Sequence, residues 1–320
     1  MKKGSIIAIT LVMVAVIIII IAVEFHTGRP GKRGENLYAF KIGTLAEVDS
    51  SWLGWEEIRN IVVQKDSLAA IASLGEDIYL SGAGFFMKIS PEGRQEMYVS
   101  TEGTPTALTV TDSAVYLAFT HYITRFSPEG EIIREWEPLN GLSYITSLKV
   151  TGDLLFAADA GNRTILNYKT DGTLLKRISG NTDNESVHGF IIPSPYFDLD
   201  IHDNELWVAN PGMHTLEYFG LDGTFRGFWS NPSYDLKGFS GCCNPAHIAV
   251  MDDGTIVTSE KGLVRIKIYK PSGELLSVVA QPALFGNTNV APDLAVSPSG
   301  LIYALDFSQN KIRVFRKIAE

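Results

Sequence analysis

The sequence has few cysteines and lacks most of the short motifs that identify enzymes. Its only two cysteines, Cys242 and Cys243, are neighbours in the chain. A structural zinc site of the Cys-x-x-Cys kind needs spaced pairs of cysteines, so the sequence does not support one. A Gly-rich phosphate loop, a G-x-S-x-G nucleophile turn and an H-E-x-x-H metal motif are also absent. No common signature of nucleotide, serine-hydrolase or zinc-protease chemistry is therefore present.

Acidic residues outnumber basic ones outside the first residues. The formal net charge of the whole chain is −9. Residues 1–33 hold five basic side chains and Glu24, a local charge of +4, so the rest of the chain carries −13. A surface of this sign repels phosphate backbones, which argues against nucleic-acid binding. The content of 45% hydrophobic and 20% charged residues is instead typical of a globular protein with a sizeable core.

One long apolar run is present, and it lies close to the amino terminus. The 19 residues 5–23 carry no charge, and as a helix they would extend about 28 Å, close to one hydrocarbon core. Lys2 and Lys3 precede the run, which predicts that the amino terminus stays in the cytoplasm and that the rest of the chain is extracytoplasmic. A cleaved signal peptide is the alternative, but the run does not end in the small residues that such peptides favour. The predicted organisation is a cytoplasmic segment 1–4, a transmembrane signal-anchor helix 5–23, a linker 24–35 and a folded domain 36–320.

Within residues 36–320, short apolar strands recur around turns that contain glycine. Five copies share the same arrangement, and their turn glycines are Gly93, Gly130, Gly172, Gly223 and Gly273. Each copy is preceded by one more short strand, so a repeat has four strands joined by tight turns, which is the unit of a propeller blade. Asp-Gly and Ser-Gly pairs supply the positive φ that such hairpin turns need.

A sixth copy begins at Leu301 but stops before its fourth strand. An unpaired third strand would leave an open sheet edge, which proteins avoid. Two segments ahead of the first blade could pair there, LYAFKI from Leu37 or EIRNIVV from Glu57. The sequence therefore predicts an all-β fold, a six-bladed β-propeller closed by an N-terminal strand that completes the last blade.

Two stretches of the repeat carry a family resemblance. LLFAADAGNRTILNYKTDG from Leu154 and NPAHIAVMDDG from Asn244 resemble the repeat of NHL-type propellers. The resemblance covers roughly residues 68–317 and is weaker in the first two blades. It implies a binding platform, although related six-bladed rings include lactonases, arylesterase-like hydrolases and an amidating lyase.

The first strand of each blade lines the central channel, and one position at its start stands out. Small residues occupy this position in blades one to three, whereas Asp198, His247 and Asp293 occupy it in blades four to six. Imidazole and carboxylate groups together could ligate a divalent metal ion, and they could equally transfer protons. A third interpretation is that they only solvate a wet channel. The long loops 179–195, 230–244 and 280–291 are expected on the same face, where sites usually form.

A second position, at the end of the second strand, holds further candidates. Asp306 fits the Asp or Asn that closes such turns through bonds to the backbone. Glu260 departs from this preference and lies in the same blade as His247, so we also consider it for site chemistry. Both residues are therefore ligand-binding candidates beside the channel position.

The cysteine pair has three interpretations. Cys242 and Cys243 have Cα atoms about 3.8 Å apart, shorter than the usual disulfide range, so a bond between them would be strained and easily reduced. Outside the cytoplasm exposed thiols tend to oxidise, which favours such a vicinal disulfide. The alternatives are two buried thiols, or a redox or soft-metal site that includes His247.

These observations predict a membrane-anchored extracytoplasmic NHL-type propeller that acts as a platform for a ligand or a protein partner. One alternative is a metal-dependent hydrolase or lyase with its site at the channel mouth. Another is a redox-linked protein that uses the cysteine pair. The predicted partners are the membrane, through one helix, and a protein or a small molecule; the candidate cofactor is a divalent metal ion. Whether the protein is an enzyme stays open at this point.

Overall fold

The structure, a computed structural model, describes residues 3–27, 46–180, 189–286 and 290–319. It divides into two compact units, residues 1–42 and residues 43–320. The candidate closing strand from Leu37 and much of the predicted linker lie outside the described residues.

The first unit contains one helix, α1 (Lys3–Thr27), of 25 residues. Among the described residues, no helix is long and apolar enough to cross a membrane. The transmembrane anchor expected at residues 5–23 is not supported by this finding and stays a prediction.

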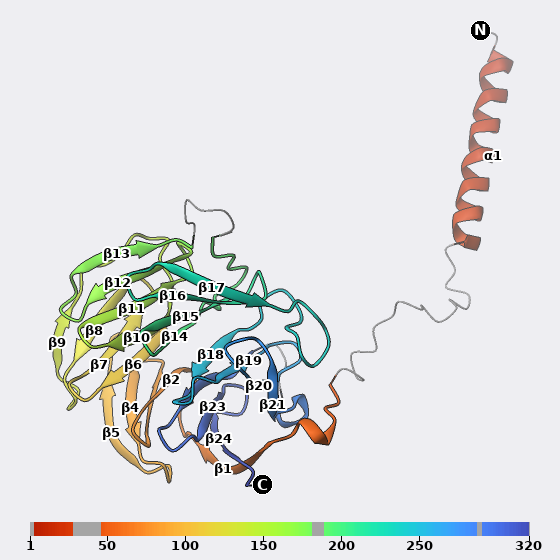
Figure 1. The fold of residues 1–320 in the computed structure, drawn as a ribbon. Coiled ribbons are helices and arrows are strands. Elements are labelled where there is room, and N and C mark those ends of the chain that lie inside the picture. The colour runs from red at the N-terminus through yellow and green to blue at the C-terminus, as the bar shows by residue number, and fades with distance from the viewer. Residues whose placement is uncertain (1–2, 28–45, 181–188, 287–289, 320) are drawn as a thin grey trace. The chain divides into compact units, whose positions relative to one another are not determined.

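The second unit is a ring of six four-stranded antiparallel sheets (Figure 1), which confirms the predicted six-bladed propeller. Each sheet is a blade whose strands follow one another in the chain, except in the last. Blade one is formed by β2 (Leu68–Leu74), β3 (Asp77–Gly82), β4 (Phe85–Ile89) and β5 (Gln95–Ser100). Blade two is formed by β6 (Ala107–Thr111), β7 (Ala114–Phe119), β8 (Tyr122–Phe126) and β9 (Ile132–Glu135). Blade three is formed by β10 (Ile145–Thr151), β11 (Leu154–Asp159), β12 (Thr164–Lys169) and β13 (Leu174–Ile178). Blade four is formed by β14 (Leu199–His202), β15 (Glu205–Asn210), β16 (Thr215–Gly220) and β17 (Phe225–Ser230). Blade five is formed by β18 (His247–Val250), β19 (Ile256–Ser259), β20 (Ile266–Tyr269) and β21 (Leu275–Ala280). Blade six is formed by β22 (Asp293–Val296), β23 (Ile302–Asp306), β24 (Lys311–Lys317) and β1 (Trp55–Val62).

The ring is closed at its centre by the first strand of each blade. The six inner strands β2, β6, β10, β14, β18 and β22 contact one another in that order, and β22 returns to contact β2. The second and third strands are almost wholly buried, whereas the outermost strands other than β21 are largely exposed. The hydrophobic core therefore lies between neighbouring blades and surrounds a channel lined by the inner strands.

The last blade takes its outer strand from the N-terminal side of the domain. Strand β1 pairs antiparallel with β24, with Ile61 opposite Ile312, and Figure 1 shows the two strands side by side near the carboxyl terminus. Ile61 is buried in the same cluster as Ile89 and Ile312. The segment from Glu57, one of the two candidates in the sequence, thus occupies the edge of the sixth blade.

The turn glycines of the repeat have a second role besides positive φ. Gly93 has φ +89°, and a Cβ atom there would lie 2.7 Å from Ile61 of the preceding blade. Gly273 has φ +86°, and a Cβ atom there would lie 2.7 Å from the ring of Trp229, again in the preceding blade. A side chain at these turns would therefore both strain the backbone and push neighbouring blades apart.

Candidate functional site at the channel mouth

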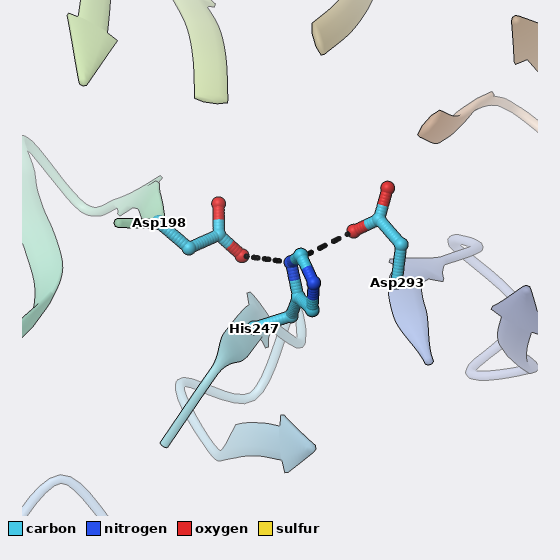
Figure 2. A group of neighbouring side chains, drawn as sticks. All are labelled: Asp198, His247 and Asp293. Carbon is cyan, nitrogen blue, oxygen red and sulfur yellow. Dashed lines mark ion pairs between the residues drawn. The ribbon is translucent and has the colours of Figure 1, made fainter. Parts of the chain in front are cut away.

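Three ionisable side chains meet where the inner strands of blades four, five and six begin. Asp198 directly precedes β14, while His247 and Asp293 are the first residues of β18 and β22. Figure 2 shows the imidazole of His247 between the two carboxylates. His247 Nδ1 lies 3.5 Å from Asp198 Oδ2 and 3.3 Å from Asp293 Oδ1. The closed propeller thus brings together residues that lie up to 95 positions apart in the chain, from Asp198 to Asp293.

The cluster is mostly buried but still open to the channel. The side chains of Asp198, His247 and Asp293 are 11%, 17% and 15% exposed. The ring of Tyr196 packs edge-on against His247, with the ring centres 5.3 Å apart. A group held in this way keeps one orientation, because the neighbouring ring and the strand backbone limit its rotamers.

Each carboxylate also ties its blade to the next one. Asp198 Oδ2 accepts a hydrogen bond from the backbone N–H of Ile248 at 2.8 Å, and Asp293 Oδ2 accepts one from Ile71 at 2.9 Å. The other oxygen of each carboxylate accepts the N–H of the residue that follows it. These bonds fix both carboxylates and give them a structural role, whatever else they do.

Burial and the opposite charges of the imidazole and the carboxylates shift the pKa values of the three side chains. Burial alone would lower the pKa of His247, but the charges of Asp293 and Asp198 raise it above its ordinary value. Burial would raise the pKa of Asp198, yet the hydrogen bond and charge of His247 hold it below the usual range. For Asp293, burial dominates over the charge of His247 and raises the pKa. The cluster therefore favours an imidazolium beside an ionised Asp198.

Two further ionisable residues line the channel, and sequence reasoning missed both. Lys149 on β10 lies 3.2 Å from Asp200 on β14, and Asp200 Oδ2 accepts the N–H of Val250 in the next blade at 2.8 Å. Burial would lower the pKa of Lys149, but the carboxylates of Asp200, Asp198 and Asp293 raise it. Side chains at i and i+2 of a strand share one face. Extending the alignment of the inner strands by two residues, from Ser147 to Lys149 and from Asp198 to Asp200, would have identified both residues.

A small cavity lies within this lining. It has a volume of about 30 Å³, and its walls include Lys149, Asp198 and Asp293. A cavity of this size holds one or two water molecules, and a polar wall makes water or an ion the natural occupant. Among the described residues, this cavity is therefore a narrow polar site, smaller than an organic molecule of drug size needs.

The cluster suits a divalent cation in its donor types and spacing. One ligand atom from each of Asp198, His247 and Asp293 lies within 4.8 Å of the others. Bonds of about 2.1 Å in a tetrahedral arrangement place ligand atoms about 3.4 Å apart, and the observed nitrogen–oxygen distances are 3.3 and 3.5 Å. Metal binding would require the imidazolium to release its proton, as metal ligation by histidine always does.

The remaining carboxylate candidates lie elsewhere and have their own partners. Glu260 is fully buried and contacts Arg265 at 2.8 Å and Lys267 at 2.6 Å. Asp306 is also buried; it accepts the N–H of Ser308 and pairs with Arg313 at 3.0 Å. The channel cluster does not include either of them. Glu260 thus belongs to a buried ion-pair group, and Asp306 closes its turn.

The cysteine pair lies in the loop that leads into β18. Both cysteines are free thiols; Cys242 is exposed and Cys243 is buried. Their Sγ atoms are 3.1 Å apart. The neighbouring Lys261 places its Nζ 3.5 Å from Ser194 Oγ and 5.1 Å from the ring centre of Tyr196, the residue that packs on His247. Ser194 also hydrogen-bonds to Cys243, so adjacent side chains connect this cysteine to His247.

The fold and this site together define a six-bladed β-propeller with an ionisable cluster at one end of its channel. No protein-family model and no curated protein sequence matches the chain. Among solved structures, the WD40 β-propeller domain of Doa1 is similar with a TM-score of 0.55 and 12% identity, over 83% of this chain and 98% of that one. Streptogramin B lyase is similar with a TM-score of 0.57 and 13% identity, over 84% of this chain and 100% of that one. Identities this low establish the fold alone, and membership of the NHL family stays a prediction.

Proposed function

We propose that this chain is an NHL-type binding propeller that recognises a ligand or a protein partner over the channel-mouth face, with a divalent cation held by Asp198, His247 and Asp293 as part of the site. The observation that carries the proposal is the convergence of three ligand atoms within 4.8 Å from three successive blades. Propellers commonly act as binding platforms, and rigid strands hold such a cluster more firmly than loops do.

The distribution of charge supports this choice of face. Blades one to three place Ala70, Ala107 and Ser147 at the corresponding positions of their inner strands, so at this position of the inner strands the ionisable groups come from blades four to six. The loop residues 189–197 and 231–246 lead into the strands on that side. An uneven rim of this kind gives a partner a defined orientation, because long loops and charged groups coincide.

Location at the outer face of a cytoplasmic membrane is a further part of the proposal, and it rests on the sequence. The uncharged run 5–23 has the length of a membrane span, and Lys2 and Lys3 precede it. The 25-residue helix α1 includes this run. The propeller would then face partners outside the cytoplasm.

A metal-dependent hydrolase or lyase is the second candidate, because the cluster offers three protein ligands within the part of the chain that the structure describes. Structural zinc sites use four protein ligands, whereas catalytic sites keep one position for water or substrate. A metal ion there could polarise a carbonyl or lower the pKa of a bound water. The ligand donors Asp198, His247 and Asp293 would serve in both functions, so the two candidates differ in turnover and not in metal binding.

The test is a titration of the purified full chain with Mn²⁺, an ion that favours carboxylate over thiolate ligands. We expect one ion per chain, with an affinity that falls more than about a hundredfold in His247→Ala, since loss of a direct ligand costs more than loss of a residue that only orients a ligand. His121→Ala is the matched control, because His121 is exposed and lies outside the cluster. A parallel titration with Zn²⁺ in the Cys242→Ser, Cys243→Ser background covers a site that prefers a softer ion.

The same preparations separate the candidates. Hydrolysis of a p-nitrophenyl ester that requires the added ion and disappears in His247→Ala favours the enzyme, whereas stoichiometric binding without turnover favours the platform. If neither ion binds stoichiometrically, or if His247→Ala binds as tightly as the wild type, the cluster holds no cation and only ties the blades together.

A further inference from the structure

The loop that carries the two cysteines is held by Asn244, the residue that directly follows them. The side chain of Asn244 donates a hydrogen bond to the backbone oxygen of Lys261 at 2.9 Å and accepts one from the N–H of Lys261 at 2.9 Å. The backbone oxygen of Asn244 lies 3.0 Å from His214 Nδ1. The Cys242–Cys243 pair is thus presented on a braced segment, and this limits the motions that would separate the two sulfur atoms.

The two thiols differ sharply in their surroundings. Cys242 is exposed, whereas Cys243 is 1% exposed. Their Sγ atoms are already within 3.1 Å of each other, and a disulfide needs about 2.05 Å. One thiol is therefore accessible to a reagent in solution, whereas the other is shielded from it.

The buried thiol has the surroundings of a reactive cysteine. Burial raises the pKa of the Cys243 thiol, but hydrogen bonds from Ser194 and Cys242 and the charge of Lys261 more than offset this, so its pKa lies below the ordinary value. The pKa of Cys242 is raised, first by its hydrogen bond to Cys243 and then by the charge there. Reactive cysteines lie in electropositive, partly exposed surroundings; in this pair the cation acts on Cys243 and the exposure belongs to Cys242.

We propose that Cys242 and Cys243 form a redox-active pair that exchanges with an external disulfide, with Cys242 as the entry thiol and Cys243 as the resolving thiol. The proposal stands apart from the channel-mouth function, because neither cysteine belongs to the Asp198–His247–Asp293 cluster. It assigns Lys261 a positioning role: its charge helps to lower the pKa of Cys243 and so increases the share of the thiolate that the second step requires.

The exchange has two steps. Cys242 loses its proton to solvent and its sulfur attacks one sulfur of the external disulfide; that S–S bond breaks, and the first thiolate leaves and takes up a proton. The Cys243 thiolate then attacks Cys242 Sγ, the mixed disulfide breaks, and the second thiolate leaves. In total, two protein thiols are oxidised to one disulfide and one external disulfide is reduced to two thiols.

The experiment treats the reduced full chain with glutathione disulfide and follows free thiols and protein mass. We expect the wild type to lose both thiols and end without a glutathione adduct. Cys243→Ser is expected to stop at a stable adduct on Cys242, because no resolving thiol remains. Cys242→Ser is expected to react far more slowly, since Cys243 alone is shielded from solvent.

Lys261→Met tests the positioning role and has a matched control. Loss of the cation should slow resolution of the mixed disulfide about threefold for each unit by which the pKa of Cys243 rises, because the thiolate becomes rarer but more nucleophilic. Lys270→Met should leave the rate unchanged, since Lys270 is exposed and pairs with Glu274. The proposal is overturned if the wild type keeps both thiols, if it retains the adduct, or if Cys242→Ser reacts as fast as the wild type.

Discussion

Lys267 shows at the scale of one residue how burial and partners together set the chemistry of a side chain. It is fully buried, and its ammonium group lies 2.6 Å from Glu260 and 2.6 Å from the backbone oxygen of Gly238. Nζ also lies 4.8 Å from the ring centre of Phe239. These contacts attach the long 231–246 loop to β20, so a charged pair in the core holds one of the loops beside the proposed site. Removing one partner from such a pair is strongly destabilising.

The pH dependence of stability tests this description of Lys267. Burial, opposed by Glu260 and reinforced by Arg265, lowers the pKa of Lys267 from 10.5 to about 8. Between these values the unfolded chain binds more protons than the folded one, so the free energy of unfolding should rise with pH in this window by up to about 1.4 kcal/mol per pH unit. Urea unfolding of the wild type at pH about 8 and about 9.5 measures the slope.

Two variants test whether Lys267 causes this rise of the free energy of unfolding with pH. Lys267→Met removes the titrating group and should remove its share of the rise between the two pH values, whereas Lys270→Met should keep it, because Lys270 is exposed. Above the ordinary tyrosine pKa of 10.0, buried tyrosines such as Tyr269, whose pKa is raised by burial, act in the opposite direction. An equal slope in the wild type and Lys267→Met would contradict the assignment.

The channel residues could be predicted individually, whereas the role of Glu260 could not. Inner strands share a fixed period of two, so aligning them on one aliphatic residue was enough to find Asp198, His247 and Asp293. Glu260 directly follows β19, close to the equivalent place, but its partners Arg265 and Lys267 lie five and seven residues further along the chain. Whether those cations reach back depends on the conformation of the turn between β19 and β20, which local pattern does not specify.

At the scale of elements, β1 is the strand that turns six consecutive repeats into a closed ring. It joins residues 55–62 to β24 at the end of the chain. Two segments, from Leu37 and from Glu57, satisfied the sequence criteria for this role, because an outer strand needs only short-range alternation. Which segment pairs with the sixth blade depends on how far each one lies from β24 in the folded ring. The sequence could therefore predict that a closing strand exists, but not which of the two segments forms it.

Truncation of the buried face of β1 should weaken this closure. Ile61 is 6% exposed and packs with Ile89 and Ile312. Ile61→Ala removes these contacts and leaves a cavity, so we expect the free energy of unfolding to fall by about 2–5 kcal/mol. Val62→Ala is the matched control: the residue is adjacent in the same strand but 70% exposed, so a change within about 0.5 kcal/mol is expected. Equal losses in urea unfolding would show that β1 does not pack as described.

At the scale of the whole molecule, closure of the ring explains why one end of the channel differs from the rest. The ionisable cluster, the braced cysteine loop and Lys261 all come from blades four to six or from the loops that lead into them. Blades one to three contribute small residues to the same rim. The sequence could predict this asymmetry from loop lengths, but the contact between Tyr196 and His247 depends on the three-dimensional course of the 189–197 loop.

The predicted anchor concerns the whole chain, because it decides which compartment this asymmetric face meets. If residues 5–23 span a membrane, the full chain should stay in the membrane fraction after an alkaline carbonate wash. An alkaline phosphatase fused after Glu320 should then be active, since Lys2 and Lys3 place the amino terminus inside.

A paired substitution within the run supplies the decisive comparison. Ile17→Arg with Ile18→Arg adds two charges near the middle of the run, each at a cost of about 2.5–3.5 kcal/mol for insertion, and should move the chain out of the washed membranes. Ile17→Leu with Ile18→Leu keeps the hydropathy and should leave the chain there. A wild-type chain that is released by the wash, or a mature amino terminus that begins after residue 23, would rule out an uncleaved anchor.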